Sequence, residues 1–193
     1  EAPVSYQHYK ITDTFDYATG AFERFENVEG EVSHQRAVMY VRGEFWVVVD
    51  RLITDRPRQV DALWHWHPDN EVVRKRAAVQ TDNPRGNLAV VPVSEQNFDI
   101  RFVEGQESPE IQGWYSPEYN LYEPNVASFY TAEINGTETI VWLLLPSEEK
   151  IPKVKTEILA ETAEAVRLSI SLRGRDWQLE VPFTNSEAAS LSN

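Results

Sequence analysis

The unbroken apolar run from Phe45 to Val49 constrains the fold of this chain more than any other stretch. Its last three residues are valines, which are stiff at χ1 and favour a strand over a helix. Because no polar residue alternates with the apolar ones, both faces of this strand are expected to be covered by protein. Gly43, just before the run, can adopt the positive φ of a tight turn. The segment therefore predicts a central strand joined by a hairpin to residues 32–41.

Alternating apolar and polar residues, with turn residues between them, recur along most of the remaining chain. About a dozen short strands of this kind predict an all-β fold, an antiparallel two-sheet β-sandwich. Residues 1–184 are expected to form this single domain, and residues 185–193 a frayed tail. Thr19 and Gly20 suggest a turn, and residues 156–165 are rich enough in Glu and Ala to leave a helix open as an alternative.

The charge and the absence of cysteine exclude several classes of function. Thirty-one acidic and 18 basic residues give a formal net charge of −13, so neither nucleic acid nor an anionic membrane is expected as a partner. No cysteine is present, which excludes disulfides, thiolate zinc sites and thiol nucleophiles. No apolar run approaches the roughly 18 residues of a membrane span.

Residues 105–124 form a long segment in which no strand or helix period survives, and loops of this length are often functional. Flat aromatic rings with polar edges suit the faces of pyranose sugars. The segment therefore predicts a substrate-binding platform made of Trp114, Tyr115, Tyr119 and Tyr122. The alternative is that these rings only pin the loop across the end of the sandwich.

Polar residues elsewhere give weaker signals. His65 and His67 lie two positions apart and so on one face of a strand, but no third ligand is identifiable and we assign no metal site. The basic cluster at residues 74–76 suits either an acidic glycan or a guarded strand edge. Asp50 and Arg51 are expected to form an ion pair or a turn contact. No catalytic residue is assigned.

Four segments carry a family resemblance. They include Ser33-His34-Gln35-Arg36 with Val47-Val48-Val49-Asp50-Arg51, then Trp64-His65-Trp66-His67-Pro68, Gln112-Gly113-Trp114-Tyr115 and Leu143-Leu144-Leu145-Pro146. In this order they resemble the heparinase II/III-like family of bacterial polysaccharide lyases, over residues 9–146. The resemblance implies an incomplete α/α toroid followed by a β-sandwich. It also implies β-elimination, in which a tyrosine and a histidine move the protons and polar groups neutralise a uronate carboxylate.

The family's functional residues do not carry over to this chain. Its catalytic tyrosine lies in the toroid, and its sandwich histidine and zinc ligands lie on first strands that would precede Glu1. The resemblance therefore implies the later part of the sandwich, inactive alone and without a cofactor of its own. The parent would have an upstream toroid, zinc in many members, an acidic polysaccharide as substrate and a periplasmic or secreted location. A stand-alone carbohydrate-binding module or a purely structural module are the alternatives.

Overall fold

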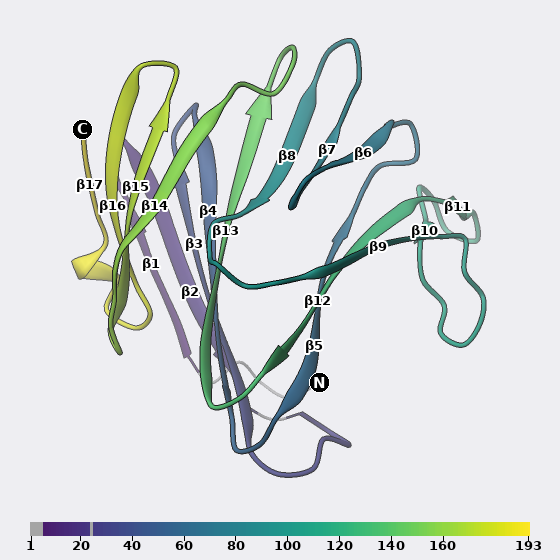
Figure 1. The fold of residues 1–193 in the computed structure, drawn as a ribbon, viewed down its shortest axis with the longest axis horizontal. Coiled ribbons are helices and arrows are strands. Elements are labelled where there is room, and N and C mark those ends of the chain that lie inside the picture. The colour runs from purple at the N-terminus through teal and green to yellow at the C-terminus, as the bar shows by residue number, and fades with distance from the viewer. Residues whose placement is uncertain (1–5, 24) are drawn as a thin grey trace.

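A computed structural model describes residues 6–23 and 25–193, whose regular secondary structure consists almost entirely of antiparallel strands (Figure 1). The largest sheet has eight strands in the order β1-β2-β3-β4-β13-β8-β7-β6. These strands are β1 (Tyr6–Ile11), β2 (Phe15–Phe22), β3 (Val32–Val41), β4 (Phe45–Thr54), β13 (Thr137–Ser147), β8 (Asn87–Pro92), β7 (Ala78–Thr81) and β6 (Val72–Lys75). We call this the central sheet.

The apolar run at residues 45–49 begins β4, which lies inside the central sheet between β3 and β13. Phe45, Val47 and Val49 are buried in one core, and Val48 is buried in a second core on the opposite face. The predicted central strand with two covered faces is therefore confirmed. Gly43 has φ +77° in the turn that joins β3 to β4, as expected of that hairpin.

A four-stranded sheet covers one face of the central sheet. It contains β14 (Val154–Glu161), β15 (Ala165–Leu172), β16 (Arg175–Pro182) and β17 (Ser190–Ser192). The core between the two sheets includes Met39 and Val141 of the central sheet and Leu168 and Trp177 of the smaller one. The predicted antiparallel β-sandwich is confirmed by these two facing sheets.

A three-stranded sheet packs against part of the opposite face and adds a third layer. It consists of β5 (Arg58–His65), β12 (Val126–Ile134) and β9 (Asp99–Glu104), in the order β5-β12-β9. Trp142 of β13 is fully buried beneath it. The centroid of its ring system lies 4.9 Å from the ring of Tyr130, 5.3 Å from that of Phe98 and 5.7 Å from that of Trp64. This aromatic cluster joins the two sheets.

The structure corrects one local expectation and decides one alternative that the sequence left open. Thr19 and Gly20 form no turn, because they continue β2 and pair with Ala37 and Arg36 of β3. Residues 154–161 are a strand, β14, rather than part of a helix. Every second residue of β14 is half-buried and the others are exposed, and this period of two matches a pleated strand and not a helix.

The tail at residues 185–193 is ordered rather than frayed. Asn185 caps a short 3₁₀ helix, η1 (Ser186–Ala188), and β17 then pairs with β16. Lys10 of β1 donates hydrogen bonds to the carbonyl oxygens of Glu187 (2.8 Å) and Ala189 (3.0 Å). These contacts hold the chain end against the sandwich. In the described ranges, no helix is long and apolar enough to cross a membrane.

The long segment at residues 105–124 closes on itself through two very short strands, β10 (Trp114–Tyr115) and β11 (Glu123–Pro124). Figure 1 shows this loop at the opposite end of the molecule from β14–β17. Gly113 has φ +73°, and a Cβ atom there would lie 2.8 Å from the backbone of Val103 and Glu104. Only glycine therefore fits where the loop crosses the end of β9.

Candidate functional site

Two adjoining hollows lie on the face of the central sheet that the three-stranded sheet only partly covers. Their volumes are about 480 and 590 Å³, and His34 and Arg36 of β3 line both of them. One hollow extends over β1 and β2, past Tyr9 and Gly20, and the other extends over β4 to β5 and includes Asp50. We call the two together the β3 groove.

Strand register places the polar side chains of β3 in this groove. Ala37 and Met39 are buried in the core between the central and four-stranded sheets, so His34 and Arg36 point to the opposite face of the central sheet. Arg36 lies directly opposite Asp50 of β4 on one side and Gly20 of β2 on the other. Because glycine has no side chain, the sheet surface beside Arg36 is open toward β2.

The carboxylate of Asp50 organises the polar part of the groove. Arg36 donates to it from Nε (2.6 Å, to Oδ1) and from Nη2 (2.9 Å, to Oδ2). The Nε2 atom of His34 lies 2.6 Å from Oδ1, and the Nε1 atom of Trp142 donates to Oδ2 at 3.0 Å. The Asp50 side chain is 5% exposed, against 30% for His34 and 48% for Arg36. The acid is thus buried below two basic side chains that reach the surface.

These contacts change the acidity of Asp50. Burial alone would raise the pKa of its carboxyl, but hydrogen bonds from His34 and Arg36, with the positive charge of Arg36, hold the pKa below the ordinary value of 3.8. The same contacts raise the pKa of Arg36. The pair is therefore ionised at neutral pH.

Arg58 of β5 lines the far wall of the groove, but its charge is already engaged. Its Nε donates to Oγ1 of Thr54 (2.7 Å) and its Nη2 to Oδ1 of Asp55 (3.0 Å). Hydrogen bonds from Arg56 and, to a smaller extent, Arg58 lower the pKa of Asp55 to about 2. Arg58 is only 17% exposed and serves mainly to fix the turn between β4 and β5.

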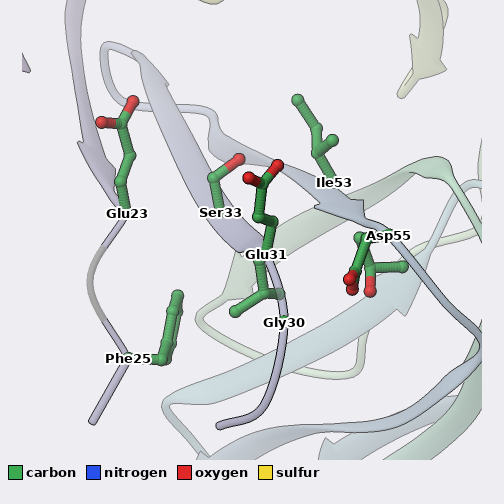
Figure 2. Close-up of a pocket in the computed structure, with 9 residues that line it drawn as sticks. Glu23, Phe25, Gly30, Glu31, Ser33, Ile53 and Asp55 are labelled. Atoms are coloured by element: carbon green, nitrogen blue, oxygen red, sulfur yellow. The ribbon is translucent and has the colours of Figure 1, made fainter.

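A third hollow, of about 540 Å³, lies at the turn that precedes β3. Figure 2 shows the carboxylates of Glu23, Glu31 and Asp55 around it, with Phe25 and Ile53 as apolar neighbours. An anionic ligand would be repelled by such a lining. This hollow is therefore a poor site for an acidic glycan.

The structure divides the four aromatic residues predicted to bind substrate into two pairs. Trp114 and Tyr115 are half-buried in β10, where Trp114 Nε1 donates to the carbonyl oxygen of Gln106 at 3.0 Å. Tyr119 and Tyr122 are 92% and 72% exposed. The first pair fixes the loop, as the alternative interpretation has it, whereas the second pair is open to a ligand. None of the four lines the β3 groove, and their role in substrate binding stays a prediction.

Two other sequence signals are resolved by the structure. The Nε2 atom of His65 lies 3.2 Å from Oε1 of Gln112, whereas Nδ1 of His67 lies 3.5 Å from Oδ2 of Asp69. The two histidines thus contact different partners. The basic cluster at residues 74–76 begins in β6, an edge strand of the central sheet, as the guarded-edge interpretation expects.

The expected contact between Asp50 and Arg51 is wrong. Successive residues of a strand point to opposite faces, so Arg51 lies on the side of the four-stranded sheet. Its guanidinium carbon is 4.7 Å from the ring centre of Phe183, and it donates to the carbonyl oxygens of Thr162 and Ala163. Asp50 pairs instead with Arg36 on the neighbouring strand.

The described residues do not fit the zinc site that the resemblance implies for many family members. Within residues 6–23 and 25–193, no three side chains of the His, Asp and Glu type come together as metal ligands. His34 and Asp50 are a histidine–carboxylate pair, but Arg36 and Trp142 already donate to that carboxylate. The positive guanidinium of Arg36 lies beside Asp50 where a metal cation would bind, so this pair does not fit zinc.

Comparisons with known proteins identify the family of this chain. The family profile described as Heparinase II/III-like, C-terminal matches residues 18–155. The chain belongs to this heparinase II/III-like family. The match to the heparinase II/III-like profile covers the β3–β4 hairpin and all of the three-stranded sheet. No curated protein matched the chain.

Solved structures give the same fold at low sequence identity. The heparan sulfate lyase HepC from Pedobacter heparinus superimposes with a TM-score of 0.78 and 18% identity, over 93% of this chain and 28% of that protein. A heparinase III structure superimposes with a TM-score of 0.71 and 15% identity, over 91% of this chain and 26% of the other. This heparinase II/III-like chain thus spans little more than a quarter of the lyases that it resembles.

The β3 groove was missed by sequence reasoning, although His34, Arg36 and Asp50 all lie in the first family-like segment. A signal for it exists in the hairpin. Arg36 and Asp50 each lie seven positions from Gly43, so a turn centred on that glycine places them opposite one another. The alternation of β3 and β4 then puts both on one face with His34.

Proposed function

We propose that this chain is the sandwich portion of a lyase that cleaves uronic-acid glycans by β-elimination. The observation that carries the proposal is the family match over residues 18–155. The superposition of nearly the whole chain on part of the heparan sulfate lyase HepC supports it. Because the chain spans 28% of that lyase, we assign the activity to a longer protein in which an α/α toroid precedes these residues.

β-Elimination needs a base for the C5 proton, an acid for the leaving glycosidic oxygen and neutralisation of the uronate carboxylate. In our proposal the toroid and the first sandwich strands supply the tyrosine and the histidine that move the protons. This chain supplies a wall of the glycan site and is inactive alone. Zinc, where the longer protein holds it, is bound outside this chain, and the protein works in the periplasm or outside the cell.

The test is a lyase assay on the longer protein with a panel of glycans that contain glucuronate, iduronate or mannuronate. Elimination leaves a C4–C5 double bond in the product, so ultraviolet absorbance rises as chains are cleaved. We expect such a rise with at least one uronic-acid glycan and none with neutral glycans. No elimination product from any uronic-acid glycan would refute the proposed reaction.

A second candidate function is carbohydrate binding by the 105–124 loop, and the exposure of Tyr119 and Tyr122 favours it. Tyr122 already makes an edge contact with Trp114, with ring centroids 5.4 Å apart. That contact orients the Tyr122 ring, whereas Tyr119 projects almost fully into solvent. A sugar could therefore stack on either ring without rearrangement of the loop.

Tyr119→Ala and Tyr122→Ala are expected to lower glycan affinity by roughly fivefold each while changing stability by less than about 0.5 kcal/mol. The rings are exposed, so their loss leaves no cavity. Calorimetric titration and a thermal melt measure the two effects. Trp114→Ala is the matched control, because the half-buried Trp114 ring holds the loop and its loss should lower stability as well. Unchanged affinity in both tyrosine variants would remove the loop from the binding site.

A further inference from the structure

We propose that Arg36 forms an anion subsite of the β3 groove that binds the carboxylate of a uronate residue, while His34 beside it accepts a hydrogen bond from a hydroxyl group of the sugar. This inference rests on the proposed function and makes it specific, because it assigns a substrate contact to residues of this chain. The observation behind it is that buried Asp50 binds one edge of the Arg36 guanidinium. The rest of the guanidinium lies at the surface.

The hydrogen bonds show which part of Arg36 is free. A guanidinium can bind carboxylates through its side edge, formed by Nε and one Nη, or through its end edge, formed by both Nη atoms. Asp50 occupies the side edge through Nε and Nη2. Within the described residues, Nη1 of Arg36 has no hydrogen-bond partner, and the side chain is 48% exposed. The end edge is therefore available to a second carboxylate.

Asp50 also makes Arg36 a rigid receptor. A free surface arginine loses side-chain entropy when it binds a ligand, which weakens the complex. Here Asp50 is fixed in turn by Trp142, whose ring is fully buried in the second core. The geometry of the guanidinium is thus set before a ligand arrives, and less entropy remains to be lost.

The surroundings of Arg36 suit a sugar more than a compact ion. Gly20 lies opposite Arg36 and Ala18 lies two residues before it, so the floor of the groove is low on the β2 side. Tyr9, which is 74% exposed, stands at the β1 edge, where its ring can pack against a pyranose face. With the Nε2 proton of His34 directed at Asp50, its Nδ1 atom can accept a hydrogen bond from a sugar hydroxyl.

Charge favours this groove over the neighbouring acidic hollow. The acidic hollow presents Glu23, Glu31 and Asp55, whereas Asp50 beside Arg36 is buried and paired. The other carboxylate that lines the groove, that of Asp61, accepts a hydrogen bond from Thr131. Because the Arg36–Asp50 pair is neutral as a whole, binding must come from short hydrogen bonds rather than long-range attraction. We therefore expect the affinity to depend only weakly on salt.

Arginine-detected NMR tests the subsite on the 193-residue chain. The probe is an unsulfated oligosaccharide that contains glucuronate, and its control is the same oligosaccharide with every carboxyl group converted to the methyl ester. The Nε–H signal of Arg36 is assigned by its loss in Arg36→Lys. We expect this signal to shift on titration with the acid and to stay in place with the ester. An equal shift with both ligands, or no shift with either, overturns the inference.

Variants separate direct contact from structural support. Arg36→Lys keeps a positive charge beside Asp50 but removes the planar end edge, and should weaken binding by about tenfold. Gly20→Val leaves the Arg36–Asp50 pair intact and fills the surface beside it, so a comparable loss is expected without loss of fold. Arg74→Lys, in edge strand β6, is the matched control and should bind normally. The amide spectrum of each variant reports whether the fold is retained.

The remaining outcomes are also decisive. Unchanged affinity in Arg36→Lys and Gly20→Val, with both variants folded, overturns the subsite. Perturbations confined to Tyr119 and Tyr122 place the sugar on the loop instead and overturn it too. Neither result tests the proposed lyase activity. That proposal depends on the formation of an unsaturated product and not on which residues of this chain contact the glycan.

Discussion

Trp142→Ala is expected to lower the free energy of unfolding by about 3–5 kcal/mol. The side chain has no exposed surface, and its ring lies within 5.7 Å, centroid to centroid, of the rings of Trp64, Phe98 and Tyr130. Its removal leaves a cavity between the central and three-stranded sheets. It also removes the N–H group that donates to Asp50. Urea denaturation followed by fluorescence and circular dichroism measures the loss.

Trp142→Phe is the control for the cavity. It keeps an aromatic ring in the second core but removes the hydrogen bond to Asp50, so its loss should be smaller, about 1–3 kcal/mol. A loss below about 1 kcal/mol in Trp142→Ala would contradict the placement of this residue as the joint between two sheets.

Asp50→Ala is expected to lower the free energy of unfolding by about 3–5 kcal/mol, because it breaks a buried ion pair by removing one partner. The variant leaves the inner edge of Arg36 and the N–H group of Trp142 without an acceptor. The more exposed ion pair between Asp16 of β2 and Arg42, in the turn after β3, provides the comparison. Asp16→Ala should cost less than about 1 kcal/mol, since water solvates both groups there. Equal losses in the two variants would show that Asp50 is not buried as described.

The effect of Asp50 should also depend on pH. Its folded-state pKa lies below the ordinary value of 3.8, so the stability it adds is fully present above that value. This stability is lost as the pH falls through the lowered folded-state pKa, where the carboxyl becomes protonated. The difference in unfolding free energy between the wild type and Asp50→Asn should therefore be constant near neutrality and shrink in strong acid. A difference that stays the same across the acid range would contradict the lowered pKa.

Local patterns in the sequence were sufficient to predict the hairpin around Gly43 and the central position of β4. Three consecutive valines with no polar alternation permit few other structures, and a glycine at a two-strand junction sets the register. The alternation of apolar and polar residues along the rest of the chain likewise predicted short strands, of which β15 is one. These features depend on neighbours a few residues apart, which is the range over which sequence patterns are informative.

Features that depend on distant contacts were not predictable. Asp50 and Trp142 are 92 positions apart, and β13 inserts between β4 and β8 only in the folded sheet. The register of the hairpin around Gly43 pairs Asp50 with Arg36, but no local pattern reports that Trp142 also contacts this carboxylate. In the 105–124 loop, aromatic composition predicted one platform, whereas in the structure Trp114 and Tyr115 are half-buried and Tyr119 and Tyr122 are exposed. Exposure of a loop residue follows from the whole fold.

In the proposed lyase this chain forms one wall of the uronate site, and the proton-transfer groups lie in another segment. Ultraviolet absorbance of the unsaturated product tests it most directly, measured with the 193-residue chain alone and with a joined protein in which the toroid and the first sandwich strands precede the same chain. We expect no product from the chain alone and steady product formation from the joined protein on a uronic-acid glycan. Product formation by the chain alone, or none by the joined protein on any such glycan, would contradict the claim.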